Sequence, residues 1–349
     1  MLEEITEPLL AWYEENARIL PWREEASPYR VWVSEIMLQQ TRVEAVKPYF
    51  ERFTSVLPGI RELAICPEER LLKLWEGLGY YNRVRNMQKA AQTVMDDYGG
   101  RMPGDYEKLL RLPGIGRYTA GAIASIAFGI PVPAVDGNVL RVLSRVTMCG
   151  DDILKQSVKS RWEKELAAVI PADRPGDFNQ ALMELGAVVC VPNGMPKCGV
   201  CPVKELCAAR ERNQISEYPK KAQKKSRKIE DRTVLVIREG ERTAIRRRPE
   251  KGLLAGMYEL PNLVGCLSQQ EVLEYLKEKK LSPIRIRKLE DAKHIFSHIE
   301  WHMTGYLIRV EEMEHRESEE LIFVEPEKKE ETYPIPAAFG AYMKYWRSI

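Results

Sequence analysis

Four of the chain's seven cysteines lie within one short stretch and could together bind a metal group. Their spacing is Cys190-x7-Cys198-x2-Cys201-x5-Cys207. Four thiolates at such spacing could hold zinc or a [4Fe-4S] cluster, and spacing alone does not separate the two. In a reducing compartment, crowded cysteines favour metal binding over disulfide bonds. The stretch is therefore a candidate metal site.

A carboxyl group in apolar surroundings is a second candidate for chemistry. Glu35 lies within Val31–Leu38, a segment whose other residues are mostly apolar. Burial there would raise the pKa of the carboxyl, so that it could donate a proton near neutral pH. On this pattern alone, a glutamate on a helix is more often on a solvated face or in an ion pair. A second carboxyl group, Asp136, precedes a helix predicted to begin near Asn138 and could cap it.

The segment Leu112–Thr119, with the sequence LPGIGRYT, predicts a helix, a tight turn and a second helix. Gly114 and Gly116 permit unusual backbone angles and close approach of another molecule. The second helix would present free backbone N–H groups that suit a phosphate oxygen. A plain corner between two helices would give the same short pattern.

The elements that must position these residues are mostly helices up to about residue 208, and the cysteine loop 190–207 closes this part of the chain. Apolar residues recur there at helical spacing. The clearest segments are Ile5–Trp12, Val31–Val43, Leu71–Leu78, Ala90–Met95 and Thr119–Ile126.

The composition changes after the last clustered cysteine. Residues 209–229 are polar and basic, and we predict an exposed linker there. Most of its cations lie in the second half of this stretch, at Lys220, Lys221, Lys224, Lys225, Arg227 and Lys228. Within residues 230–349, a period of two in Thr233–Arg238 and in Thr243–Arg246, with a Glu-Gly-Glu turn between them, predicts a hairpin, and His302–Val310 predicts another strand. A helix around Val272–Leu276 is predicted between the hairpin and that strand. The sequence thus predicts an all-α domain followed by an α+β domain.

The whole-chain composition limits the function classes. With 349 residues, 44% hydrophobic and 30% charged, the chain is long enough for two globular domains. The formal net charge is only +2, so any basic surface must be local. No apolar run is long enough to span a bilayer. We expect a monomeric cytoplasmic protein without membrane contact.

Taken together, the cysteine loop, the glycine turn and Val135–Val139 resemble the endonuclease III and adenine glycosylase superfamily. The first gap between cysteines is seven residues here and six in that family. Leu20–Arg23 and Tyr29–Thr41 resemble the adenine-specific, MutY-type branch. The resemblance implies a helix-hairpin-helix glycosylase domain with a [4Fe-4S] cluster held by the four cysteines.

The resemblance also implies roles for individual residues. Glu35 would protonate the adenine and later activate water, and Asp136 would stabilise positive charge on the sugar. Asn138 would orient Asp136 or the water. Relatives that cut the strand have a lysine where this chain has Tyr118, so we expect a monofunctional enzyme that leaves an abasic site. Residues implied to line the adenine pocket are Trp22, Arg23, Leu38 and Glu184, and those implied to wedge into the base stack are Gln40 and Tyr80.

The segment Ala292–Met303 resembles a signature of the Nudix-like C-terminal domain of the same family. By this resemblance, Phe296, Ser297 and His298 would read 8-oxoguanine opposite the adenine. Because no glutamate-rich run follows Lys251–Pro261, a Nudix hydrolase role is not expected. The histidines at a spacing of four, His294, His298 and His302, would then belong to a loop and strand and not to a metal-binding helix.

The predicted substrate is therefore duplex DNA with an A·8-oxoG or A·G mispair. Three alternatives remain open: removal of thymine from G·T mispairs, a pyrimidine-lesion lyase, and DNA binding without catalysis.

Overall fold

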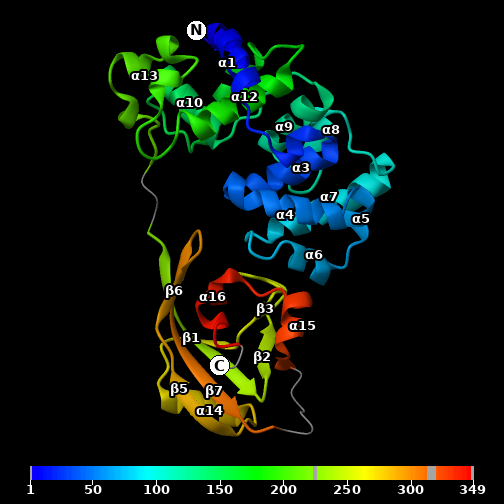
Figure 1. Ribbon diagram of the computed structural model, residues 1–349, viewed down its shortest axis with the longest axis vertical. Coiled ribbons are helices and arrows are strands. Elements are labelled where there is room, and N and C mark those ends of the chain that lie inside the picture. Colours follow the sequence, from blue (N-terminus) through cyan, green and yellow to red (C-terminus); the bar gives the residue numbers. More distant parts are fainter. Residues whose placement is uncertain (1, 223–225, 313–319, 347–349) are drawn as a thin grey trace. The chain divides into compact units, whose positions relative to one another are not determined.

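The computed structural model describes residues 2–222, 226–312 and 320–346 (Figure 1). Internal contacts divide the chain into two compact units. The helical unit comprises residues 1–66 and 82–223, and the sheet unit comprises residues 67–81 and 224–349. Lys224 and Lys225 of the predicted linker lie outside the described residues. The sequence had placed residues 67–81 with the helices, whereas their contacts place them in the sheet unit.

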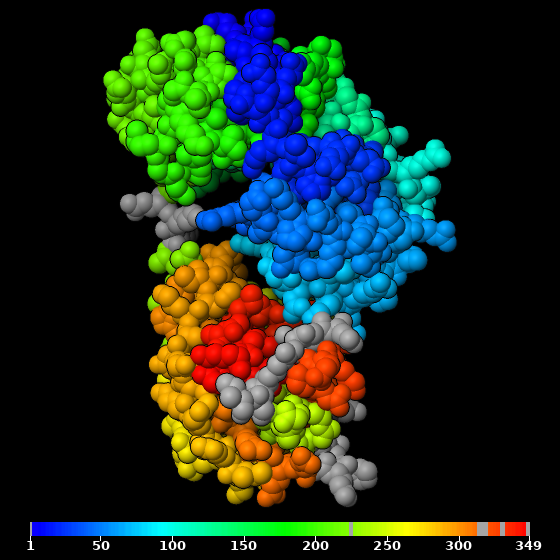
Figure 2. Space-filling model, viewed as in Figure 1, coloured from blue at the N-terminus to red at the C-terminus, as the bar shows by residue number. Residues whose placement is uncertain are grey.

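The helical unit is built from helices joined by short turns, as its 3.6-residue periodicity predicted. The helices are α1 (Leu2–Asn16), α2 (Pro21–Glu24), α3 (Pro28–Leu38), α4 (Val43–Val56), α5 (Ile60–Ile65), α7 (Asn82–Tyr98), α8 (Tyr106–Leu110), α9 (Arg117–Phe128), α10 (Gly137–Val146), α11 (Gln156–Ala167), α12 (Pro175–Val188) and α13 (Ala208–Glu211). The α12 helix packs against α1, α9 and α10. In Figure 2 the blue N-terminal helix lies on the surface beside green segments of this unit. No helix among the described residues is long and apolar enough to cross a membrane.

The ends of α3 follow from local sequence. Ser27 caps its start, accepting a hydrogen bond from the Arg30 N–H, and Pro28 occupies the first helical position. The helix ends at Leu38, five residues before the end of the apolar pattern in Val31–Val43. The chain turns there because Gln40 has a φ of 63°, which no right-handed helix can contain.

The glycine turn lies between α8 and α9, as predicted. Gly114 has a φ of 77°, and a Cβ atom at this position would lie 2.7 Å from the Cβ of Asn86. A side chain at position 114 would therefore be strained and would also collide with α7.

The first part of the predicted linker is packed on the helical unit. Ala209 in α13 is fully buried. The Arg145 guanidinium donates to the carbonyl of Tyr218 at 3.0 Å, and the N–H of Ile153 donates to the carbonyl of Lys220 at 3.2 Å. Part of the predicted linker is therefore anchored to the helical unit, although its basic composition predicted an exposed segment.

The sheet unit is a mixed sheet with helices against it (Figure 1). Its strands are β1 (Lys228–Glu239), β2 (Arg242–Arg247), β3 (Tyr258–Glu259), β4 (Asn262–Val264), β5 (Pro283–Lys288), β6 (Ala292–Ile295), β7 (Ile299–Val310) and β8 (Ile322–Val324). The long strands β1 and β7 run parallel, and the remaining pairs are antiparallel. The predicted α+β class and the first hairpin, β1–β2, are confirmed.

Apolar side chains are buried on both faces of β1. Val234 and Val236 join a core with Trp301 and Phe339, whereas Leu235 and Ile237 join a second core with the helix α14 (Gln269–Glu278). Alternate residues of a strand point to opposite faces, so a run that is buried throughout requires cover on both sides.

Residues 67–81 carry the helix α6 (Glu68–Leu74) and make polar contacts with C-terminal parts of the sheet unit. The hydroxyl of Tyr258 donates to Glu69 at 3.0 Å, and the N–H of Ile335 donates to Glu76 at 2.8 Å. These contacts give the segment partners that are distant in the sequence.

Candidate active site

One cavity of about 630 Å³ in the helical unit gathers most of the residues predicted to act on DNA. The predicted residues that line it are Trp22, Arg23, Glu35, Leu38, Gln40, Tyr118, Asp136, Asn138 and Glu184. They come from α2, α3, α9, α10 and α12 and from the turn after α3. The cavity is large enough for a purine base with its sugar.

Glu35 has the surroundings that its apolar sequence neighbourhood predicted. Its side chain, on α3, is 6% exposed. The pKa of this carboxyl is raised to about 7: burial is the main cause, a hydrogen bond from the Tyr118 hydroxyl opposes the rise, and the nearby Asp136 adds to it. Near neutral pH a substantial fraction of Glu35 is therefore protonated and able to donate.

Asp136 is the N-cap of α10 and is held at both oxygens. Its Oδ1 accepts from the N–H groups of Asn138 and Val139, each at 2.8 Å, and its Oδ2 accepts from the Asn138 side-chain amide at 2.7 Å. Burial raises the pKa of Asp136, and these hydrogen bonds together with the charge of Arg141 act against that rise. The capping role foreseen from the sequence and a fixed carboxylate in the cavity thus coexist.

Two residues behind Asn138, neither of them among the predicted site residues, fix its position. The Arg141 guanidinium donates to the Asn138 side-chain oxygen at 2.9 Å and to the carbonyl of Gly186 at 2.7 Å. A Cβ atom at Gly186 would lie 2.5 Å from the Cβ of Asn138. The absence of a side chain at position 186 therefore lets α12 approach α10 closely enough to support the site.

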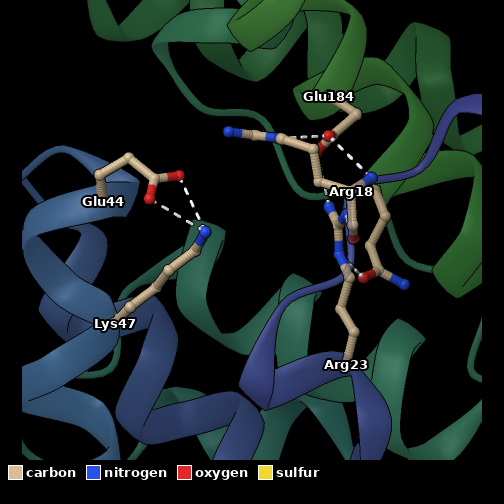
Figure 3. Close-up of polar contacts among 6 residues, drawn as sticks. Arg18, Arg23, Glu44, Lys47 and Glu184 are labelled. Carbon is tan, nitrogen blue, oxygen red and sulfur yellow. Dashed lines mark hydrogen bonds and ion pairs between the residues drawn. The ribbon is translucent and has the colours of Figure 1, made fainter.

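Glu184 is bound by two arginines, as Figure 3 shows. Its side chain is 1% exposed; Arg18 donates to Oε2 at 3.0 Å and to Oε1 at 2.5 Å, and Arg23 donates to Oε2 at 2.8 Å. Burial opposes ionisation, but the two guanidinium groups outweigh it and lower the pKa of Glu184. Arg18 was not predicted, because nothing in its local sequence distinguishes it from a surface arginine.

The remaining walls are mixed in character. Trp22 is buried, with its ring edge against Phe50 at 5.4 Å between centroids. Lys159 and Lys221 also line the cavity, although neither belongs to a recognised motif. The Glu44–Lys47 pair drawn on α4 in Figure 3 is separate from the Glu184 network, and Glu44 is 74% exposed.

The glycine turn contributes a backbone surface. Gly114 and Gly116 are exposed, and no side chain caps the N-terminus of α9. The first-turn N–H groups of this 12-residue helix thus lack a side-chain acceptor and could bind a phosphate oxygen.

The four clustered cysteines line a second, smaller cavity in the helical unit. Its other walls are mostly apolar, with the cations Arg145, Lys204 and Arg210 beside them. Arg145 approaches the sulfur of Cys190 at 3.3 Å. Among the residues that the structure describes, no group of three or more His, Cys, Asp or Glu converges on a single metal-ion position. Four thiols around an apolar cavity with adjacent cations fit a multi-atom anionic group.

The predicted residues Phe296, Ser297 and His298 belong to the sheet unit, whereas the cavity belongs to the helical unit. Phe296, Ser297 and His298 form the turn between β6 and β7. The Ser297 hydroxyl lies 3.1 Å from Nδ1 of His298, and both side chains are exposed. His294 pairs with Trp301 and His302 pairs with Lys293, so His294 and His302 lie on opposite faces of the β6–β7 ladder.

Tyr80 belongs to segment 67–81 and does not line the cavity of the helical unit. It has a φ of 49° and is 52% exposed, an uncommon combination for a large aromatic residue.

Comparison with known proteins places this geometry in a family. Residues 33–168 match the model of the HhH-GPD superfamily base excision DNA repair proteins, and residues 233–345 match the NUDIX domain. The adenine DNA glycosylase of Mus musculus is 39% identical over 350 residues, covering 83% of this chain and 68% of the relative.

Solved structures agree with the helical part of the assignment. A thermostable thymine-DNA glycosylase has a TM-score of 0.53 at 28% identity, covering 60% of this chain and 97% of that one. An endonuclease III–DNA covalent intermediate has a TM-score of 0.52 at 26% identity, covering 61% and 96%. These findings confirm the predicted helix-hairpin-helix and Nudix-like folds. The chain belongs to the adenine DNA glycosylase family of base excision repair proteins and is a DNA glycosylase.

Proposed function

We propose that the protein hydrolyses the N-glycosidic bond of adenine mispaired with 8-oxoguanine, or with guanine, in duplex DNA, and leaves the strand intact. The observation that carries the proposal is the buried Glu35, with a pKa of about 7 and bonded to Tyr118, in the same cavity as the fixed carboxylate of Asp136. Neutral adenine is a poor leaving group, so this bond needs both a proton donor for the base and an anion near the sugar.

The reaction assigns a separate task to each group. The target nucleotide is extruded into the cavity, and Glu35 donates its proton to the base. The C1′–N9 bond then breaks with its electron pair leaving on the adenine, which departs neutral. Asp136 stabilises the positive charge on the sugar. Water adds to C1′ as the Glu35 carboxylate accepts its proton, which regenerates the acid.

The absence of a lysine at position 118 is the argument for a monofunctional enzyme. The Tyr118 phenol lies against Glu35, where an amine would be needed for attack on the sugar. Burial is the main cause that raises the pKa of Tyr118 well above its usual value, so the phenol stays neutral and donates its hydrogen bond. We propose that it orients Glu35 and contacts the sugar.

Recognition of the DNA uses groups outside the carboxylate pair. We assign phosphate binding to the backbone at Gly114 and Gly116 and wedging into the base stack to Gln40 and Tyr80. Trp22, Arg23, Leu38 and Glu184 hold the extruded adenine. Ser297 and His298, supported by Phe296, read the N7–H and the 8-oxo group that distinguish 8-oxoguanine from guanine.

We further propose that Cys190, Cys198, Cys201 and Cys207 hold a [4Fe-4S] cluster. When bound, the cluster would link the four cysteines of the loop 190–207 to one another, and we assign it no redox step. Metal analysis of the purified protein tests this directly. Iron and broad visible absorption, both lost in Cys198→Ser, are expected. Stoichiometric zinc without iron would overturn the cluster assignment and leave the glycosylase proposal standing.

The decisive test is single-turnover base release from a duplex with one A·8-oxoG pair. Wild type should release free adenine and leave the strand uncut until alkali is added. Glu35→Gln should slow release by about 10²–10⁴-fold or more, since it removes the proton donor. Glu44→Gln makes the same change at the exposed Glu44–Lys47 pair and should leave the rate unchanged.

Two outcomes would redirect the assignment. Release of thymine from G·T duplexes without adenine release would favour the thymine-specific alternative. A borohydride-trapped adduct with strand cleavage would indicate lyase chemistry, for which Lys159 and Lys221 are the lysines on the cavity wall.

A further inference from the structure

The turn that follows α3 has a specific conformation. The Thr41 N–H donates to the carbonyl of Leu38 at 3.3 Å, which closes a four-residue turn. Gln39 has φ −59° and ψ 114°, and Gln40 has φ 63°. These angles match a type II turn, whose third residue is usually glycine because its φ is positive. A glutamine occupies that position here.

Arg83 lies against this turn. It is the second residue of α7 (Asn82–Tyr98), and its guanidinium nitrogen Nη1 points at the C-terminal end of α3. That nitrogen lies 2.6 Å from the carbonyl oxygen of Ile36, 3.3 Å from that of Met37 and 2.5 Å from that of Gln39. The last carbonyls of a helix have no partner within the helix, and a cation there is favourable.

The bond to the Gln39 carbonyl has a consequence for Gln40. Type I and type II turns differ mainly by a flip of the peptide that joins their two central residues. In the type I form the Gln39 carbonyl would point to the other side and Gln40 would take a negative φ. Because Arg83 binds this carbonyl, it favours the type II form over the form that glutamine would otherwise adopt more readily.

We propose that Arg83 is a positioning residue that holds the Leu38–Thr41 turn in its type II form and so directs the Gln40 side chain for base extrusion. The inference rests on the proposed function, because Gln40 is a wedge only if a base leaves the stack. Gln40 is exposed and lines the cavity, so the orientation of its backbone decides what its side chain can reach. A hydrogen bond of 3.4 Å from the Gln39 amide to Thr119 attaches the same turn to α9.

The test compares two substrates that differ in the cost of extrusion. One duplex pairs adenine with 8-oxoguanine, and the other places adenine opposite an abasic-site analogue, where no base pair has to be broken. Arg83→Met should slow single-turnover release about tenfold or more on the paired substrate and by no more than about twofold on the unpaired one. Arg83→Lys should recover most of the rate, because a single nitrogen makes all three contacts.

Two controls separate positioning from general damage. Arg61→Met removes an exposed arginine of the helical unit by the same change and should leave both rates near wild type. The pH profile of base release on the unpaired substrate should be the same for Arg83→Met and wild type, since Glu35 is not moved. Equal losses on both substrates, or a shifted pH profile, would overturn the inference.

A double substitution asks whether Arg83 acts through Gln40. Gln40→Gly removes the side chain and also the preference for a negative φ. On that background, Arg83→Met should change the paired-substrate rate by no more than about twofold, whereas independent effects that multiply would overturn the proposal. If Arg83→Met does not fold, Arg83→Gln, whose shorter side chain carries no cation to the turn, takes its place in the same cycle.

The proposed function and this inference can fail separately. Absence of adenine release by the wild-type protein would contradict the proposed function. The turn is tested without activity by a crystal structure of Arg83→Met, in which a flipped Gln39 carbonyl supports the inference and an unchanged type II turn contradicts it.

Discussion

The catalytic cavity and the Phe296–His298 turn carry polar groups of two different kinds. In the cavity, Glu35 is buried and the carboxylate of Asp136 accepts three hydrogen bonds. In the turn between β6 and β7, Ser297 and His298 are exposed and contact each other. In the proposed function the two regions have separate tasks: the rigid buried groups serve bond cleavage, and the accessible groups read the opposite base.

The difference has an energetic basis. A proton donor needs a raised pKa, and burial raises it at the expense of folding stability. A hydrogen-bonding reader needs no shifted pKa, so it can remain in water until DNA arrives. Substitutions in the cavity should thus alter chemistry or stability on every substrate, whereas substitutions in the turn should alter only discrimination between substrates.

After the loss expected for Glu35→Gln, the largest effect on the rate of base release is expected at Asp136. Asp136→Asn keeps the shape and a good N-cap but removes the charge, so base release should fall about 10²–10³-fold on both A·8-oxoG and A·G. Single-turnover rates on the two duplexes, together with the thermal midpoint, check this. A large drop in the midpoint with only a small drop in rate would mean that Asp136 serves mainly as a cap.

The buried Glu35 should also make the folding stability of the protein depend on pH. Its folded pKa of about 7 lies above the ordinary value of 4.5, so the folded state binds the proton more tightly than the unfolded state. Wild type should therefore lose stability as the pH rises from about 4.5 through about 7. Glu35→Gln should be more stable than wild type at pH 8, by about 1–3 kcal/mol, and equal to it near pH 4.

Denaturant unfolding of both proteins at the two pH values measures that difference. A Glu35→Gln protein that is less stable at pH 8 would show that the carboxylate is solvated or paired in the folded state. Glu44→Gln again provides the exposed control, with little change expected at either pH.

The smallest effect should appear in the turn. Ser297→Ala removes one hydrogen bond to the lesion, worth about 1 kcal/mol, and should slow release from A·8-oxoG by roughly 5–10-fold. Release from A·G should change by less than about twofold. Equal effects on the two duplexes would contradict the proposal that the turn recognises the opposite base and takes no part in bond cleavage. Ser282→Ala, which deletes an exposed serine hydroxyl elsewhere in the sheet unit, is the matched control.

Local sequence was sufficient where a local rule decides the structure. The carboxyl in an apolar segment, the glycine turn and the aspartate before a helix all lie where those rules predicted. Each of these features depends on residues within a few positions of one another, as the Asp136 carboxylate does on the N–H groups of Asn138 and Val139. The division into a helical part and a part that contains a sheet was also predicted, from the change of apolar spacing from helical to a period of two.

Contacts between distant residues could not be foreseen in the same way. Arg18 reaches Glu184 across 166 positions, and Gly186 matters only because Asn138 lies against it. The end of α3 was overestimated because Arg83, far along the chain, stabilises a turn that the apolar pattern of Val31–Val43 conceals. In each case the two residues in contact are far apart in the sequence, so only the folded structure shows that they meet.

The assignment of residues 67–81 to the sheet unit bears on how a shortened chain should be interpreted. Removing the C-terminal residues would delete Tyr258 and Ile335, which contact Glu69 and Glu76. The remaining fragment would keep Trp75, which is fully buried in the intact protein, without the unit to which its segment belongs. A truncated enzyme would thus lose both the turn proposed to read the lesion and the rest of the unit to which Tyr80 belongs. During synthesis, likewise, residues 67–81 leave the ribosome long before Tyr258 and Ile335, so these contacts can form only late.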